Sequence, residues 1–151
     1  MTLPLTEGTC LAKEPLKIDD RVLGRAELLA EGDRELIRAV LVHGQSAASV
    51  ARMMRTPPRT IQARVRRLTR RITSRTFLEA ARALPYLSPA DAALARMRYC
   101  QGATYGDLCR DVKLTLHQVR RNLDRIAAQV ETISRISHRG IPSARLEAQA
   151  P

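Results

Sequence analysis

The sequence predicts an all-α protein, and three observations support this prediction. The apolar residues are mainly Leu, Ile, Val, Ala and Met, and aromatic residues make up only 3% of the 151-residue chain, a composition that favours helices over sheets. Two segments carry aliphatic residues at alternating spacings of four and three, which form a single stripe on an α-helix. The chain also aligns with itself at a spacing of 58 residues, which predicts that one helical unit occurs twice.

The internal repeat aligns residues 33–68 with residues 91–126. Many positions match in chemical class, as where Thr104 aligns with Ser46. The predicted cap, turn and apolar stripe fall at the same positions in both copies. This agreement supports the repeat more strongly than its few identities do. The identical pairs are Asp33/Asp91, Leu36/Leu94, Arg38/Arg96, Gly44/Gly102, Arg52/Arg110 and Arg67/Arg125.

The first two helices of each copy are delimited by glycine and by hydroxyl side chains. A helix at about 33–43, and its counterpart at about 89–101, ends at Gly44 or Gly102, because glycine readily adopts the positive φ of a helix C-terminus. Ser46 or Thr104 is then the expected N-cap of a short helix at about 47–55 or about 105–112.

A third and longer helix follows the turns "RTPP" and "KLTL". Pro58 suits the first turn of a helix, where its missing N–H has no partner to lose, and Thr115 is the expected N-cap in the second copy. The inner stripe is Ile61, Val65, Leu68 and Ile72 in one copy and Val119, Leu123, Ile126, Val130 and Ile133 in the other. The second stripe is close to heptad spacing, so it either packs within its own domain or forms the seam of a homodimer.

The flanking segments complete the predicted organisation. Residues 19–33 can form a helix leading into the first copy, and residues 74–86 predict a linking helix that stops near Pro85. We therefore expect an N-terminal tail at 1–18 and a first unit at 19–75. A linking helix at 76–88, a second unit at 89–137 and a C-terminal tail at 138–151 follow.

Most of the positive charge lies in one segment. The net charge is +11, and residues 33–75 contribute +9 of it through eleven arginines and two acidic residues. Such a basic block predicts a polyanionic partner, either nucleic acid or an anionic membrane. The run "TPPRTIQARVRRLTRRI" (56–72) has an aliphatic stripe, which a disordered tail does not need, and the stripe is narrower than the apolar face of a membrane-surface helix. The pattern favours a docked helix with a basic outer face, and hence nucleic acid without membrane association.

Several other classes are not supported. No apolar run approaches the ~18 residues of a membrane span, and the N-terminus has no secretory-signal pattern. Cys10, Cys100 and Cys109 lack CxxC spacing. Cys100 and Cys109 fall on apolar positions of predicted helices and are interpreted as buried free thiols in a reducing cytosol. The acidic residues are scattered, and there is no glycine-rich phosphate loop or HExxH motif. We therefore predict a cytoplasmic, nucleoid-associated protein that is not an enzyme and has no catalytic site, metal site or cofactor.

The order of a short helix, a turn and a longer basic helix is the helix-turn-helix plan. The run "TIQARVRRLTRRI" (60–72) resembles the recognition helix in the region-four domain of bacterial extracytoplasmic-function sigma factors, which is related to the LuxR-type helix-turn-helix. The run "LSPADAALARMRYCQGATYGDLCRDVKLTLHQVRRNLDRI" (87–126) resembles the same domain over its full length, including the aromatic Tyr105. The family usually has glycine in the turn before the recognition helix, where this chain has Arg55 and Lys113. It also pairs this domain with an aromatic-rich promoter-melting domain, for which 151 residues leave no room.

The resemblance implies two tandem sigma region-four-like helix-turn-helix units in a transcription regulator that binds promoter double-stranded DNA. By analogy with that docking mode, residues at the start of each third helix face base edges, and the later arginines of the first copy meet phosphates. The candidate DNA-binding residues are Arg59, Thr60, Gln62, Ala63, Arg64, Arg66, Arg67, Arg70 and Arg71 in the first copy, and Thr115, His117, Gln118, Arg120 and Arg121 in the second.

Three questions about function and partners stay open at this point. The second copy is less basic, since it contains Asp107, Asp111 and Asp124, so it either reads DNA weakly or binds protein. The whole chain could instead be an interaction module for RNA polymerase or another regulator. A third hypothesis is an accessory protein for DNA packaging or recombination in a phage or mobile element.

Overall fold

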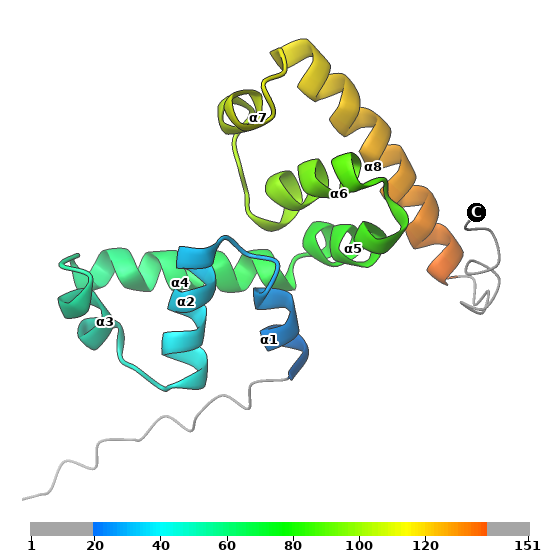
Figure 1. Ribbon diagram of the computed structural model, residues 1–151. Coiled ribbons are helices and arrows are strands. Elements are labelled where there is room, and N and C mark those ends of the chain that lie inside the picture. Colours follow the sequence, from blue (N-terminus) through cyan, green and yellow to red (C-terminus); the bar gives the residue numbers. More distant parts are fainter. Residues whose placement is uncertain (1–19, 139–151) are drawn as a thin grey trace, which may run out of the picture.

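The computed structural model describes residues 20–138, and every regular element within that range is a helix (Figure 1). The all-α prediction is confirmed. The predicted tails lie outside the described residues, apart from His138. The helices are α1 (Asp20–Ala26), α2 (Glu31–Ile37), α3 (Ala47–Met53), α4 (Pro58–Thr73), α5 (Arg75–Ala83), α6 (Pro89–Ala95), α7 (Tyr105–Val112) and α8 (Leu116–His138). α2 and α6 continue into π-helical turns at Arg38–Val42 and Arg96–Cys100, and a 3-10 turn at Leu84–Tyr86 follows α5.

Capping side chains explain where several helices begin. The Ser46 hydroxyl accepts a hydrogen bond from the backbone N–H of Ser49 at 3.1 Å, so it caps α3 as expected. Thr104 caps α7 in the same way. Thr115 accepts from the backbone N–H of Gln118 at 3.3 Å, just before α8. α4 has no side-chain cap and begins with Pro58, whose fixed φ suits the first turn of a helix.

The backbone repeats at the spacing of 58 residues that the sequence suggested. The segment 31–42, which ends in a π-helical turn, is matched by 89–100, and both π-helical turns occupy aligned positions. Gly44 and Gly102 follow them with φ values of 61° and 72°, where glycine avoids the clash that a Cβ would bring. A second aligned pair, Arg55 and Lys113, has φ values of 50° and 54°. Both copies therefore contain the same two left-handed positions.

The segment 19–33 is not one continuous helix, contrary to our expectation. α1 ends at Ala26, and the chain turns through hydrogen bonds from the Leu28 and Leu29 N–H groups to the carbonyls of Arg25 and Ala26. The turn places Leu29 in the core, where it is 2% exposed. Burial of this leucine stabilises the folded state by about 1.5–3 kcal/mol. Helix propensity does not include this free energy, because it depends on contacts with distant residues.

Two clusters of buried side chains form the core. The first includes Leu36, Ile37, Ile61, Leu68 and Ile72, and the second includes Leu94, Leu108, Val119, Leu123 and Ile126. The stripes of both long helices are thus turned inward. The stripe of α8 is buried against its own chain down to Val130, and Ile133 is partly buried. Packing within the domain, the other interpretation of this stripe, is what the structure shows.

α5 links the two units and is also part of both cores. Phe77 near its start is fully buried in the first cluster, and Ala83 at its end is fully buried in the second. The π-helical turn Arg96–Cys100 also contributes to the first core, because Cys100 belongs to the first cluster. Burial raises the pKa of the Cys100 thiol to about 11, which keeps the thiol neutral.

Two arginines make further contacts between the halves of the chain. Arg71 at the end of α4 donates a hydrogen bond to the carbonyl oxygen of Gln101 at 2.9 Å, and Arg96 donates to the carbonyl of Glu27 at 2.9 Å. These contacts join residues far apart in sequence, so the two units are packed against each other.

Candidate nucleic-acid interface

The inner face of α4 holds this helix against the first core. Ile61, Leu68 and Ile72 are each 2% exposed or less, and Val65 is partly buried. α3 precedes α4 and packs against it across the turn 54–57 (Figure 1). The opposite face of α4 therefore points to solvent along the whole helix.

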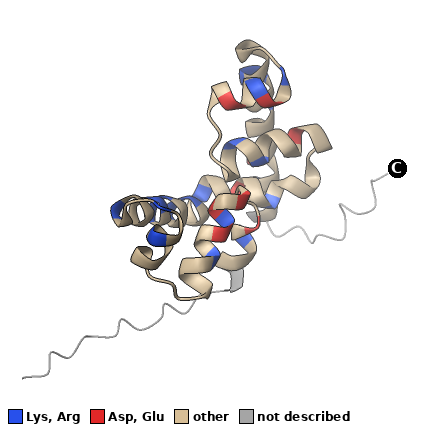
Figure 2. Cartoon of the chain, turned by 60° about the vertical axis from the view of Figure 1, so that its left-hand side comes forward, with Lys and Arg blue, Asp and Glu red and all other residues tan. Residues whose placement is uncertain are grey.

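That outer face is basic and carries no acidic residue. The side chains of Arg59, Thr60, Gln62, Ala63, Arg66, Arg67 and Arg70 are all exposed. Within residues 20–138, none of the four arginines among them forms an ion pair or a side-chain hydrogen bond with the protein. Figure 2 shows the concentration of Lys and Arg along α4. Four unpaired guanidinium groups on one helix face create a local positive potential that attracts a polyanion. We name this surface the α4 basic face.

Two arginines that the sequence placed with this group are engaged elsewhere. Arg64 points back toward α2, and its Nη2 lies 2.6 Å from the carboxylate of Asp33, which is only 17% exposed. Arg71 donates to the Gln101 carbonyl, as described above. Both side chains stabilise the fold through partners about 30 residues away, so they are not part of the α4 basic face. The sequence pattern could not show this, because the partners are set by tertiary packing.

The start of α8 presents a different set of groups. Gln118 is a candidate base reader, but its amide oxygen accepts hydrogen bonds from the N–H and the hydroxyl of Thr115 at 2.9 and 3.0 Å. Two donors occupy this oxygen, so it cannot also accept a hydrogen bond from an adenine amino group without breaking the cap. His117, Arg120 and Arg121 are exposed. These three residues stay candidates for contacts with DNA.

The remaining charges on α8 partly cancel. Asp124 is exposed and aligns with Arg66 of α4. Arg125, which aligns with Arg67, forms an ion pair with Asp91 at 2.6 Å, where Asp91 is 13% exposed. The second unit therefore has fewer free arginines on its long helix and carries an acid among them. Its attraction for phosphate is weaker than that of the α4 basic face.

An arginine and aromatic cluster in the second unit was not anticipated. The guanidinium carbons of Arg98 and Arg120 lie 4.7 and 5.7 Å from the ring centroid of Tyr105, which is 38% exposed. Both distances are within cation–π range. The sequence indicated Tyr105 only through the family resemblance, and Arg98 is separated from it by the turn at Gly102. The signal that the sequence offered was a basic residue near the end of one helix, followed after the turn by an aromatic residue at the start of the next helix.

The two units also differ in charge at the cap of the second helix, because the cap of α7 includes a carboxylate. The Asp107 carboxylate accepts hydrogen bonds from the Thr104 hydroxyl and backbone N–H at 2.6 and 3.0 Å. These bonds lower the pKa of Asp107 below its ordinary value. At the aligned position α3 has Ser49, so the first unit carries no carboxylate at this helix start.

The two candidate faces lie at separate ends of the molecule. The turn into α4 is beside α3 at the left of Figure 1, and the turn into α8 is beside α7 at the top; Figure 2 shows the same separation. Within the described residues, no helix is both long enough and apolar enough to cross a membrane. Over the same range, no three His, Cys, Asp or Glu side chains are grouped so that they could hold a metal ion.

Comparisons with protein-family models, with curated proteins and with solved structures find no match to this chain. The resemblance to sigma region-four domains thus stays a prediction from the residues. The functional argument depends on the α4 basic face itself.

Proposed function

We propose that this protein is a sequence-specific DNA-binding transcription regulator, in which α3 and α4 act as a helix-turn-helix and α4 enters the major groove of promoter DNA. The observation that carries the proposal is the α4 basic face, whose exposed arginines have no partner within residues 20–138 and lie opposite a largely buried aliphatic stripe. This arrangement suits a helix that is fixed to the protein on one side and open to a groove on the other.

The residues of this face divide by position along the helix. Arg59 and Gln62 are near the beginning of α4, where a docked recognition helix contacts base edges. Arginine can form two hydrogen bonds with guanine and glutamine two with adenine, each pair providing ~1–3 kcal/mol of discrimination. Arg66, Arg67 and Arg70 lie further along α4 and suit contacts with phosphates, which supply affinity that falls with salt.

The proposal is tested by selecting bound duplexes from a random library and then titrating the selected duplex at increasing salt. We expect wild-type affinity to fall steeply with salt. Arg59→Ala with Gln62→Ala should reduce the ratio of affinities for selected and random duplexes by about 30-fold or more. An equal loss for every duplex would refute base reading by these residues.

Arg64 offers a matched control on the same helix. Arg66→Ala should lower affinity for all duplexes and reduce the slope of log affinity against log salt by about 0.9, the change expected for one phosphate contact. Arg64→Ala should leave that slope unchanged and instead lower stability, because its guanidinium is paired with Asp33. If both variants behaved alike, the α4 basic face would not be the contact surface.

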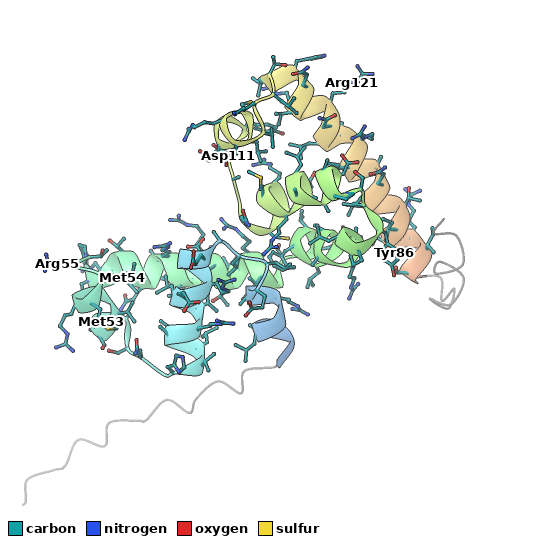
Figure 3. The ribbon with its side chains drawn as sticks, in the orientation of Figure 1. Met53, Met54, Arg55, Tyr86, Asp111 and Arg121 are labelled. Atoms are coloured by element: carbon teal, nitrogen blue, oxygen red, sulfur yellow. The ribbon has the colours of Figure 1, made fainter. Side chains whose placement is uncertain are left out.

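A second candidate function, binding to RNA polymerase or another regulator, is favoured by a groove on the second unit. Tyr86, Leu87, Thr132 and Ile133 contribute to its lining, and Tyr86 is 51% exposed. Tyr86 lies beside α8, away from the start of that helix (Figure 3). Retention of purified RNA polymerase by the wild-type chain without DNA, lost on Tyr86→Ala, would support this function; no retention would exclude polymerase as the partner.

A further inference from the structure

Arg55 and Lys113 occupy the same place in the two units. Each is in the turn between the second and third helices of its unit, and each has a left-handed backbone conformation, with φ of 50° and 54°. These are the two non-glycine residues with positive φ among residues 20–138. Both are exposed, and neither side chain has a hydrogen bond or ion pair within this part of the chain.

A left-handed turn is the position where glycine is favoured, because any Cβ crowds the neighbouring carbonyl oxygen. Asparagine is the usual second choice. Both copies instead have a long basic side chain at this site. Their surrounding residues differ, since Met54 precedes Arg55 whereas Val112 precedes Lys113. Two unlike turns that share a disfavoured conformation and a positive charge indicate a role for the charge.

The location of the pair relates it to the proposed DNA interface. Arg55 comes three residues before Pro58, the first residue of α4, and Lys113 comes three before Leu116, the first of α8. In Figure 3, Arg55 lies at the outer end of the first unit, beside Met54 and Met53. When the start of a helix enters the major groove, the phosphates that border the groove lie beside the preceding turn.

We propose that Arg55 and Lys113 each bind a backbone phosphate of double-stranded DNA, so that both units, and not only the first, contact the duplex. This inference rests on the proposed DNA-binding function and extends it to two residues outside the recognition helices. Each residue lies three positions before the long helix of its unit, and the phosphate contact complements the α4 basic face.

Asparagine variants provide the test, because Asn tolerates the left-handed conformation while removing the charge. We would compare Arg55→Asn, Lys113→Asn and the charge-retaining Arg55→Lys on full-length protein, using a fluorescent duplex at several salt concentrations. The control is Arg82→Gln, which removes an exposed arginine of α5 and lowers the net charge by the same amount. Thermal unfolding of each variant, together with Arg55→Gly, reports on the fold.

Loss of one exposed charge contact should weaken binding by about two- to fivefold. For Arg55→Asn and for Lys113→Asn we expect that loss, with the salt slope reduced by about 0.9 in each. Arg55→Lys and Arg82→Gln should bind nearly as the wild type does. Arg55→Asn and Arg55→Gly should unfold at the wild-type temperature or higher, because the crowding at positive φ is relieved, and this would show that weaker binding does not come from unfolding.

The outcomes separate this inference from the proposed function. If the wild type binds duplex with a steep salt slope and Arg55→Asn matches Arg82→Gln, the phosphate role of Arg55 is overturned while the function stands. Likewise, an unchanged slope for Lys113→Asn overturns the contact of the second unit. If the wild type shows no salt-dependent duplex binding at all, both the function and this inference fail.

Discussion

The first and second units share several backbone features at aligned positions and have very different outer surfaces. Their π-helical turns, glycine turns and left-handed basic residues recur at aligned positions. On the outer face, Arg66 of α4 aligns with Asp124 of α8, and Arg70 aligns with Ala128. The comparison teaches that buried and conformationally restricted positions specify this fold, because exchanging them costs packing or strain, whereas exposed helix positions can change charge at little cost to stability.

The ion pairs of the two units also show a conserved position combined with a variable one. Asp33 and Asp91 align and are both largely shielded from solvent, at 17% and 13% exposure. Asp33 pairs with Arg64, whereas Asp91 pairs with Arg125, one helical turn further along its helix. Each unit satisfies its carboxylate with a different arginine of the long helix. As a consequence, Arg67 of α4 has no partner within residues 20–138, whereas its counterpart Arg125 is paired.

The largest expected difference between the two units is the loss of stability when each turn glycine is replaced by alanine. At Gly44 a Cβ meets nothing within 4 Å, so Gly44→Ala carries only the strain of positive φ, about 1–2 kcal/mol. At Gly102 the Cβ would come within 2.5 Å of the Arg71 guanidinium. Gly102→Ala must also displace Arg71 from the Gln101 carbonyl, so we expect a total loss of about 2–4 kcal/mol. Urea unfolding measures both values.

A double variant isolates the cause of that difference. In a background with Arg71→Ala, the two glycine substitutions should have nearly equal cost, because the displaced group is gone. A persistent excess for Gly102→Ala would show that backbone strain, and not the contact with Arg71, distinguishes the two turns.

A smaller effect, on DNA affinity, is expected from exchanging the aligned charges of the long helices. Arg66→Asp should weaken duplex binding about tenfold, since it removes one attraction and adds one repulsion. Asp124→Arg should strengthen binding by about two- to fivefold if the second unit also docks on the duplex. Fluorescence anisotropy at fixed salt gives both values, and unchanged affinity for both variants would contradict a DNA role for these helix faces.

The smallest effect is expected at Asp107, whose carboxylate completes the cap of α7 and has no counterpart in the cap of α3. Hydrogen bonds from Thr104 lower the pKa of Asp107 in the folded protein, so its contribution to stability is complete above the ordinary pKa of 3.8. That contribution is lost as the pH falls through the lowered pKa of the folded state. Asp107→Asn should therefore reduce Tm slightly at neutral pH, and the difference from wild type should shrink in acid. A difference that stayed constant with pH would mean that the carboxylate charge does not support the cap.

Helix content and helix starts could be predicted because their causes are local. Ser46 and Thr104 cap helices through residues three positions away, and Pro58 sets its own φ. The stripe from Ile61 to Ile72 follows from helical periodicity alone. Local reasoning failed at Leu29, where a turn interrupts the helix expected for the segment. It predicted α5 as a helix, but it could not show that this helix contributes to both cores.

The sequence by itself determined an all-helical chain with two similar units and a basic stretch in the first. Only the tertiary structure decided which arginines of that stretch are free. Arg64 and Arg66 are two positions apart in one basic run, yet Arg64 is held by Asp33 from 31 residues away, while Arg66 has no partner among the described residues. The physical reason is that charge and periodicity are local properties of a sequence. An ion pair depends on which distant group the fold brings within reach.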